Sequence, residues 1–392
     1  MIGRAVAEQV LSRLKVGSLV VNYWDKQTKT YGRGEPRVAL KINDPKVLSD
    51  IIRRQDLGFG EAYMAGRLEI ASRDLLKLFE LADRNSQIAA SSSLPKIPYR
   101  RQSNTKNRQA RQIASHYDLG NDFYKLWLDQ TMTYTCAYFH SPKDSLEAAQ
   151  RQKIDHVLRK LQLQPGHEFV DIGCGWGYLV VRAAKLYGAK GLGVTLSREQ
   201  YKFAKDLAGR EGVAHLAKFK NSNYQDLLPS QKRYDRVVSV GILEHIGRGQ
   251  HAQYFKVVDG LLKPGGISLA HSITHQTETK ISPWLDKYIF PGGYIPSLRE
   301  LISLLPNYNF RVIDVENLRP HYALTLRAWL KRFEQNAPEI AKMYDENFVR
   351  MWRLYLAGSI SSFETAGNDL SQIVFSKGIN NDLPLTRKFL YR

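Results

Sequence analysis

The chain has 392 residues, enough for two or three domains of ordinary size, and its 43% apolar and 24% charged residues are typical of a globular protein. A net charge of +19 favours a polyanionic partner, namely a nucleic acid, an anionic membrane face or a phosphorylated substrate, although a solvated basic surface without a partner stays open. With two cysteines, no signal-peptide layout and no apolar run near the roughly 18 residues of a spanning helix, we expect a protein of a reducing compartment that is soluble or lies on a surface.

The first 91 residues predict a smaller, mainly helical N-terminal domain. Helical apolar spacing covers residues 6–16 and 75–81, and Val38–Ile42 is typical of a short strand. None of these segments contains a recognisable catalytic or ligand-binding motif.

A stretch without acidic residues follows. From Arg84 to Tyr117 there is no Asp or Glu, and seven Lys or Arg residues are interspersed with serines and prolines. One-sided charge with turn-forming residues is typical of an exposed linker. We therefore predict an N-terminal domain over residues 1–91, a basic linker over 92–112 and a second domain over 113–392.

The second domain alternates strands with helices. The strand patterns cover residues 168–172, 191–196, 234–240 and 267–273, and the helical patterns cover 178–187 and 198–208. This alternation predicts an α/β domain with a mostly parallel sheet and helices on both faces. Right-handed crossovers place the carboxyl ends of the strands, and any ligand, along one edge.

A glycine-rich turn follows the first of these strands. Residues 171–177 read Asp-Ile-Gly-Cys-Gly-Trp-Gly, and their three glycines permit a tight turn and close backbone approach to a ligand. The third glycine comes one residue earlier than in the dinucleotide fingerprint, and an acidic residue precedes the first. This form suits a loop packed against the adenosine and methionine parts of S-adenosylmethionine. A purely structural turn is the simpler interpretation.

Motifs beyond the loop resemble those of one family. They occupy residues 116–124, 134–139, 193–200, 241–247 and 320–322. Together with the glycine loop they resemble the cyclopropane fatty acid and mycolic acid synthases, which transfer a methylene from S-adenosylmethionine onto a cis double bond of a lipid acyl chain. The resemblance implies a class I SAM-dependent methyltransferase (Rossmann-like) catalytic domain. Residues 58–66 resemble the longer branch of the family, so the implied substrate is a membrane phospholipid.

The resemblance also implies how the cofactor is held. Its expected neighbours are Tyr134 and Thr135 at the border, Asp171, Gly173, Gly175 and Gly177 around the methionine part, Thr195, Leu196 and Gln200 on the adenosine, and Asn223 and Tyr224 beside the adenine. Many methyltransferases carry an acid for the ribose hydroxyls where this chain has Thr195. Gln200 is the expected compensating hydrogen-bond partner.

A base is the second implied component. The residues that would hold a bicarbonate ion are Cys136, Glu244, His271 and Tyr322. Attack by the alkene on the sulfonium methyl leaves a carbocation, and loss of a proton from the new methyl closes the ring. The site must therefore exclude water, supply a modest base and shield a cation. The expected shielding aromatic side chains are Tyr134, Tyr138, Phe139 and Tyr322.

Each of the four residues has a simpler interpretation. Cys136 alone is more often a buried apolar side chain, Glu244 would cap a helix, and His271 and Tyr322 would fill the core. Zinc binding by Cys136, Glu244 and His271 is disfavoured because they lack close ligand spacing, so we predict no metal. Many relatives carry a cysteine where this chain has Ser359, for which we predict a packing role.

The expected partners are phospholipid acyl chains at an anionic membrane surface, contacted by the acid-free stretch and the amphipathic N-terminal helix. We expect a cytoplasmic protein, peripheral on the inner face of the cytoplasmic membrane, and the resemblance implies a homodimer. A nucleic-acid methyltransferase is disfavoured because base-methylating signatures such as Asn-Pro-Pro-Tyr are absent. A transferase giving a methyl-branched chain, a small-amine N-methyltransferase and a non-catalytic lipid-binding homologue stay open.

Overall fold

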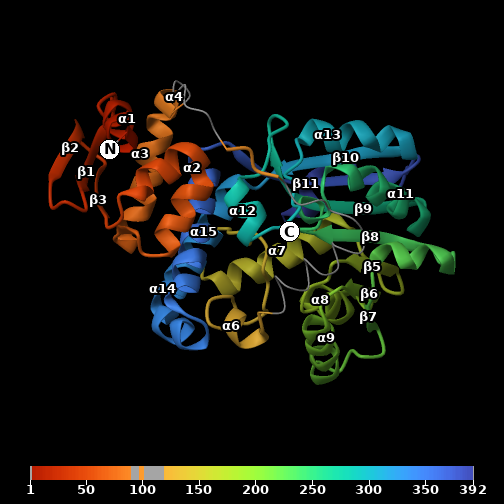
Figure 1. Ribbon diagram of the computed structural model, residues 1–392. Helices are drawn as coiled ribbons and strands as arrows, with labels where there is room; N and C mark the ends of the chain where they lie inside the picture. The colour runs from red at the N-terminus through yellow and green to blue at the C-terminus, as the bar shows by residue number, and fades with distance from the viewer. Residues whose placement is uncertain (1, 90–96, 101–118, 392) are drawn as a thin grey trace. The chain divides into compact units, whose positions relative to one another are not determined.

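The computed structural model describes residues 2–89, 97–100 and 119–391 (Figure 1). They fall into two compact units: unit 1 comprises Met1–Gln102, Ser282–Ile289 and Leu326–Gly367, and unit 2 comprises Ser103–Ile281, Phe290–Thr325 and Asn368–Arg392. The division differs from the continuous domains expected above, because two internal segments of the C-terminal part pack with the N-terminal residues. Most of the expected basic linker, 92–112, lies outside the described residues.

Unit 1 contains a four-stranded sheet in addition to its helices. The strands are β1 (Gly17–Asn22), β2 (Thr28–Arg33), β3 (Arg37–Ile42) and β4 (Leu68–Ile70), in the order β2-β1-β3-β4. The helices are α1 (Ile2–Leu11), α2 (Lys46–Met64), α3 (Leu75–Arg84), α4 (Ser86–Ala89), α12 (Pro283–Tyr288) and α15 (Glu346–Glu364), with most of α14 (Arg319–Met343) and the short η1 (Ser72–Asp74). Only β3 is visible as a pattern in the sequence, since β2 buries a single residue, Tyr31.

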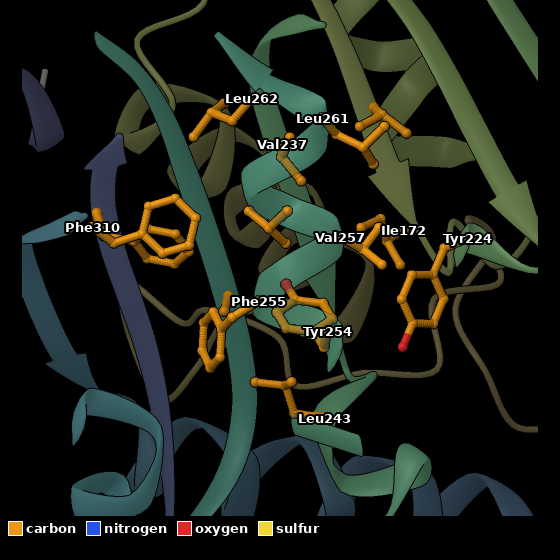
Figure 2. Packing of buried hydrophobic residues seen from close by; sticks show 14 of the residues in the cluster. Ile172, Tyr224, Val237, Leu243, Tyr254, Phe255, Val257, Leu261, Leu262 and Phe310 are labelled. Atoms are coloured by element: carbon orange, nitrogen blue, oxygen red, sulfur yellow. The ribbon is translucent and has the colours of Figure 1, made fainter. Parts of the chain in front are cut away.

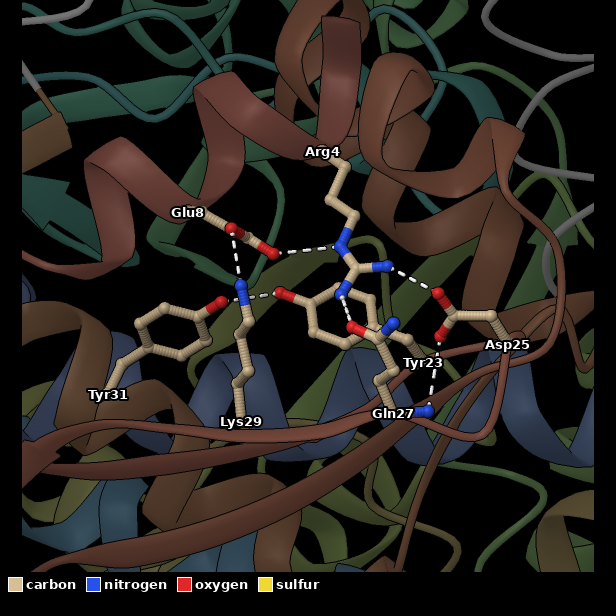
Figure 3. A network of polar contacts seen from close by, with 7 residues as sticks. All are labelled: Arg4, Glu8, Tyr23, Asp25, Gln27, Lys29 and Tyr31. Carbon is tan, nitrogen blue, oxygen red and sulfur yellow. Dashed lines mark hydrogen bonds and ion pairs between the residues drawn. The ribbon is translucent and has the colours of Figure 1, made fainter. Parts of the chain in front are cut away.

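Charged side chains attach α1 to the first hairpin (Figure 3). The Arg4 guanidinium donates to Glu8 (2.8 Å) and Asp25 (2.6 Å), and its carbon lies 4.1 Å above the centre of the Tyr23 ring. Lys29 donates to the second oxygen of Glu8 at 2.8 Å. The Lys29 and Arg4 hydrogen bonds lower the pKa of Glu8. Part of the basic charge of unit 1 is therefore paired internally.

A close contact explains one glycine of the 58–66 motif. A Cβ on Gly60 would lie 2.2 Å from Cδ1 of Trp284, so α2 approaches α12 only because residue 60 has no side chain. The indole N–H of Trp284 donates to the Met64 sulfur at 3.3 Å, and the Ser282 hydroxyl donates to Asp56. The motif thus builds the packing between α2 and α12.

The substitution Gly60→Ala is expected to destabilise the protein by about 1–3 kcal/mol, because the added methyl overpacks a filled site against Trp284. The matched control is Gly209→Ala, also in a helix, where the new Cβ meets nothing within 4 Å. That change should stabilise the protein by about 0.5–1 kcal/mol. Urea unfolding of both variants tests the assignment, and equal shifts in the same direction would contradict it.

Unit 2 is built on a seven-stranded sheet in the order β10-β11-β9-β8-β5-β6-β7. Its strands are β5 (Glu168–Ile172), β6 (Lys190–Thr195), β7 (Ala217–Asn221), β8 (Tyr234–Val240), β9 (Leu262–His275), β10 (Phe310–Asn317) and β11 (Asn368–Lys377). All neighbours from β9 to β7 pair in parallel, and β11 pairs antiparallel with β9 and β10. The expected α/β fold is confirmed. The order reverses between β5 and β8, where open α/β sheets bind ligands.

Helices cover both faces of this sheet and close two apolar cores. The helical elements of unit 2 are α6 (Asn121–Lys125), α7 (Leu146–Lys160), α8 (Tyr178–Tyr187), α9 (Arg198–Arg210), α10 (Leu243–Ile246), α11 (His251–Leu261) and α13 (Leu298–Leu304), with the short η2 (Tyr224–Ser230), η3 (Arg248–Gln250), η4 (Leu305–Tyr308) and η5 (Arg387–Leu390). Figure 2 shows the core on the α11 side, where Tyr254 and Val257 lie close to Ile172. The other core gathers side chains of α7 and α8.

With both faces covered, the edge at the carboxyl ends of the strands is where a ligand can enter. In the described part of the chain, no helix is long and apolar enough to cross a membrane.

Candidate active site

The glycine loop lies between β5 and α8, at the point where the strand order reverses. Gly173 has φ +77°, and a Cβ there would lie 2.0 Å from Cδ1 of Ile242. The amides of Gly173 and Cys174 both donate to the carbonyl of Val194, at 2.9 and 3.0 Å. The loop is therefore held between β6 and the residues after β8, and any other residue in place of its first glycine would strain the backbone and push the Ile242 side chain aside.

A cavity opens beside this loop. The expected cofactor residues that line it are Tyr134, Thr135, Asp171, Gly173, Gly175, Thr195, Leu196, Gln200 and Tyr224. Gly177 and Asn223 are not among the lining residues. A Cβ on Gly177 would lie 2.6 Å from that of Ala204, so this glycine allows α8 to pack on α9, and the Asn223 side chain accepts from the Gln225 amide at the start of η2.

Polar atoms point into the cavity from the ends of β6 and β7. The Thr195 hydroxyl donates to the Gln200 side chain at 2.7 Å, and both residues are buried. The hydroxyls of Ser222 and Tyr224 are buried without a hydrogen-bond partner among the described residues. Groups of this kind are suited to a polar ligand with an apolar ring.

Lys153 was not predicted and lies at the centre of the site. It is on α7, is 1% exposed, lines the cavity and donates to the Thr135 hydroxyl at 2.8 Å. Gln150, one turn earlier, donates to the Thr135 carbonyl at 2.9 Å. Burial lowers the pKa of Lys153 to about 8 and raises that of Asp171 to about 7. In the sequence, a lysine at a position on the apolar side of a helix was the pattern that could have indicated a buried, functional Lys153.

His271 is in the carboxyl-terminal half of β9, and Glu244, on α10, is hydrogen-bonded to the next two residues of that strand. One oxygen of Glu244 accepts from the Ser272 hydroxyl at 2.9 Å and the other from the Ile273 amide at 3.4 Å. Burial raises the pKa of Glu244 to about 7. The Nδ1 atom of His271 faces the Gln372 amide at 3.1 Å, while its Nε2 is buried without a described hydrogen-bond partner. Burial lowers the pKa of His271 well below its usual value, which keeps the ring neutral.

Two hydrogen bonds attach the segment that carries Cys136 to the start of the helix that carries Tyr322. The Ala137 amide donates to the Thr325 hydroxyl and the Phe139 amide donates to Nδ1 of His321, both at 3.0 Å. The first turns of α14 are therefore fixed to residues 136–139, the segment that carries Cys136. Burial raises the pKa of the Cys136 thiol, which is therefore neutral and donates to the Ala137 carbonyl. The Lys153 ammonium interacts electrostatically with both Cys136 and His271.

Tyr138 does not offer a free aromatic face. Its ring is stacked against His156 at 4.2 Å and against His321 at 4.6 Å, so imidazoles cover both sides. His156 is in turn bound to Glu316 at 2.7 Å. This stacking disfavours Tyr138 as a residue that shields a cation; its ring joins α7 to the first turn of α14.

The structure also bears on the first sequence motif, on Ser359 and on metal binding. Residues 116–118 of the first motif lie outside the described residues, whereas Asn121 accepts from the indole of Trp176 in the glycine loop at 2.7 Å. Ser359 lies on α15 in unit 1, while the four expected catalytic residues belong to unit 2. Across the described ranges, no group of three or more His, Cys, Asp or Glu residues is arranged to hold a metal ion.

Comparison with known proteins identifies relatives over nearly the whole chain. The family model described as "Mycolic acid cyclopropane synthetase" matches residues 104–373, and a domain of unknown function matches residues 6–93. A probable fatty acid methyltransferase of Pseudomonas putida is 36% identical over 95% of this chain and 96% of its own length. The cyclopropane-fatty-acyl-phospholipid synthase of Escherichia coli K12 is 37% identical over 90% and 92%.

A solved structure matches about two thirds of the chain. The mycolic acid cyclopropane synthase CmaA1, complexed with SAH and CTAB, superposes with a TM-score of 0.64 at 31% identity and covers 68% of this chain and 98% of its own. The similarity in fold extends over the whole of that enzyme.

Proposed function

Because the chain belongs to the mycolic acid cyclopropane synthetase family, we propose that it transfers a methylene from S-adenosylmethionine to the cis double bond of phospholipid acyl chains, forming a cyclopropane ring. Its enzyme class is that of the SAM-dependent methyltransferases. The observation that carries the proposal is the glycine-loop cavity, together with the buried Cys136 thiol, the buried neutral ring of His271 and the Glu244 carboxyl, whose pKa is raised to about 7.

The cavity fits the proposed cofactor. Gly173 and Gly175 line the cavity without side chains, so a ligand can approach the backbone there, and the buried Ser222 hydroxyl, which has no partner among the described residues, would pair with a polar group of the cofactor. Thr195 and Gln200 would meet the ribose hydroxyls with neutral groups. When bound, the sulfonium supplies an electrophilic methyl group.

The residues around Glu244 fit a bicarbonate ion, which would supply the base that removes a proton from the transferred methyl. His271 Nε2 is a buried polar atom lacking a described partner, and an anion satisfies a donor at that position. With a pKa of about 7, Glu244 can be protonated and share that proton with the ion. The Tyr322 hydroxyl would donate to the ion, and the Cys136 thiol would do so by turning away from the Ala137 carbonyl; the buried Cys136 and His271 would help to exclude water.

We place the enzyme at the inner, anionic face of the cytoplasmic membrane as a homodimer, where acyl chains are within reach. The basic balance of the chain supports the location, because each Lys or Arg near an anionic leaflet contributes about 1 kcal/mol. Cosedimentation with anionic and with zwitterionic vesicles at low salt tests the preference. Equal binding to both would contradict it.

A methyl-branched product is the second candidate, because the Pseudomonas putida relative is described as a probable fatty acid methyltransferase. Mass spectrometry of lipids from cells expressing the chain separates the two, with the Glu244→Ala variant as the control. A ring adds one CH2 to an unsaturated chain and removes its cleavage by ozone. A saturated methyl branch adds two further hydrogens, and an unchanged lipid profile would contradict both.

A further inference from the structure

We infer that Gln372 is a positioning residue that holds His271 as the tautomer protonated on Nε2, with this N–H directed at the anion of the proposed function. The identity of that anion rests on the proposed function. The orientation of the imidazole itself rests on the contacts between β9 and β11.

Gln372 and His271 are directly opposite each other in the antiparallel pair of β11 and β9. Opposed residues project to the same face of a sheet, so the pairing register brings the two side chains together. The amide nitrogen of Gln372 lies 3.1 Å from Nδ1 of His271, and the residues are 0% and 2% exposed. The register of the sheet therefore fixes both partners of this hydrogen bond.

The direction of the hydrogen bond determines where the imidazole proton lies. An NH2 group only donates, so Nδ1 must accept and the single proton of the neutral ring is on Nε2. Burial and the nearby Lys153, Lys160 and His156 lower the pKa of His271 and so disfavour a second proton. Glu316 raises this pKa, but its effect is smaller than that of burial. The ring consequently presents one N–H donor, which has no partner among the described residues.

Gln372 has no second described role. The hydrogen bond to His271 is the one that its side chain makes in the described structure, and its carbonyl oxygen is buried without a partner there. A buried amide with half of its hydrogen-bonding capacity unused costs about 1–3 kcal/mol, so it is a poor stabiliser of the sheet. Such a residue is explained by the group it orients, as are the outer partners of ligand-binding histidines.

Nitrogen NMR of histidine-labelled protein tests the tautomer directly, with the His271 signals assigned by their loss in His271→Gln. We expect Nδ1 of the unliganded wild type to be unprotonated and Nε2 to carry the proton throughout the range from pH 6 to 9. An Nδ1–H tautomer or an imidazolium would overturn the inference. The measurement does not depend on activity, and the tautomer itself is read from the wild-type protein.

The variant Gln372→Met keeps the volume and removes the donor. We expect the bicarbonate concentration that gives half-maximal turnover to rise about 10- to 100-fold, by analogy with the outer partners of metal-binding histidines, with the KM for S-adenosylmethionine unchanged. The matched control is Ser371→Ala, which deletes the 2.9 Å hydrogen bond to Thr274 between the same two strands. Its bicarbonate dependence should stay within about twofold of wild type, since it leaves His271 untouched.

The two claims fail in different ways. Wild-type turnover that does not depend on bicarbonate would overturn the anion of the proposed function, whatever the tautomer. Bicarbonate dependence that is equal in wild type and Gln372→Met would overturn the role of Gln372 alone. If Gln372→Met does not fold, Gln372→Glu retains the size but offers only an acceptor at neutral pH, and it should move a proton onto Nδ1 in the NMR experiment.

Discussion

Replacing Glu244 by Ala will lower kcat by about 10²- to 10⁴-fold, the usual contribution of a group that takes part in proton transfer. The carboxyl is buried and held by Ser272 and Ile273, so no neighbouring side chain moves easily into its place. The KM for the cofactor should change little, because Glu244 is not among the residues that line the cavity. Steady-state kinetics on vesicles of unsaturated phospholipid measures both.

The variant Glu244→Gln separates catalysis from stability. Burial raises the pKa of Glu244 to about 7, above the value of about 4.3 in an unfolded chain. The unfolded state then ionises first, so folding stability from this group is lost as pH rises from about 4.3 to about 7, by about 3–4 kcal/mol in total. Gln cannot ionise, and the variant should gain stability relative to wild type across that window. If the difference in stability between Glu244→Gln and wild type does not change with pH, the pKa of Glu244 is not raised in the folded protein.

Replacing Gly173 by Ala will weaken cofactor binding by roughly 10-fold or more, because the loop that lines the cavity must shift to relieve a strained backbone and a close contact with Ile242. The left-handed conformation costs an ordinary residue about 1–2 kcal/mol, and the clash adds about 1–3 kcal/mol. Both penalties act on the loop that closes the cavity. Isothermal titration with S-adenosylhomocysteine measures the loss of affinity.

Two controls separate strain from collision. Gly175→Ala introduces a Cβ with nothing within 4 Å, so the unliganded protein should lose only the cost of its backbone conformation. In the double variant Gly173→Ala with Ile242→Ala, the clash is relieved and part of the affinity should return. If the double variant binds no better than Gly173→Ala alone, the contact with Ile242 does not govern the loop.

The fold of unit 2 could be predicted because its signals are local. Strands β5 and β8 coincide with the predicted segments, and the glycine loop identified the edge of the sheet that carries the cavity. Of the sheet of unit 1 only β3 was predicted; β2 buries one residue and is otherwise exposed and mostly polar, and β4 is only three residues long. Neither produces an alternating pattern long enough to be distinguished from a loop.

The site was predicted less completely, because its supporting contacts join residues far apart in the chain. Gln372 meets His271 through a strand register that no local pattern encodes, and Lys153 reaches Thr135 across a loop. The same limit applies to the packing of two residues in the predicted motifs. Gly177 matched a cofactor motif but packs on Ala204, and Tyr138 matched an aromatic motif but is enclosed by histidines.

The product formed by the purified chain tests the proposed ring closure most directly. The protein is incubated with vesicles of anionic phospholipid carrying cis-unsaturated chains, with bicarbonate and with S-adenosylmethionine whose methyl group is trideuterated. We expect acyl chains that are heavier by one CD2 group and are no longer cleaved by ozone, since one deuteron leaves as the ring closes. Chains that gain the label but are still cleaved, or that gain no label, would contradict cyclopropane formation.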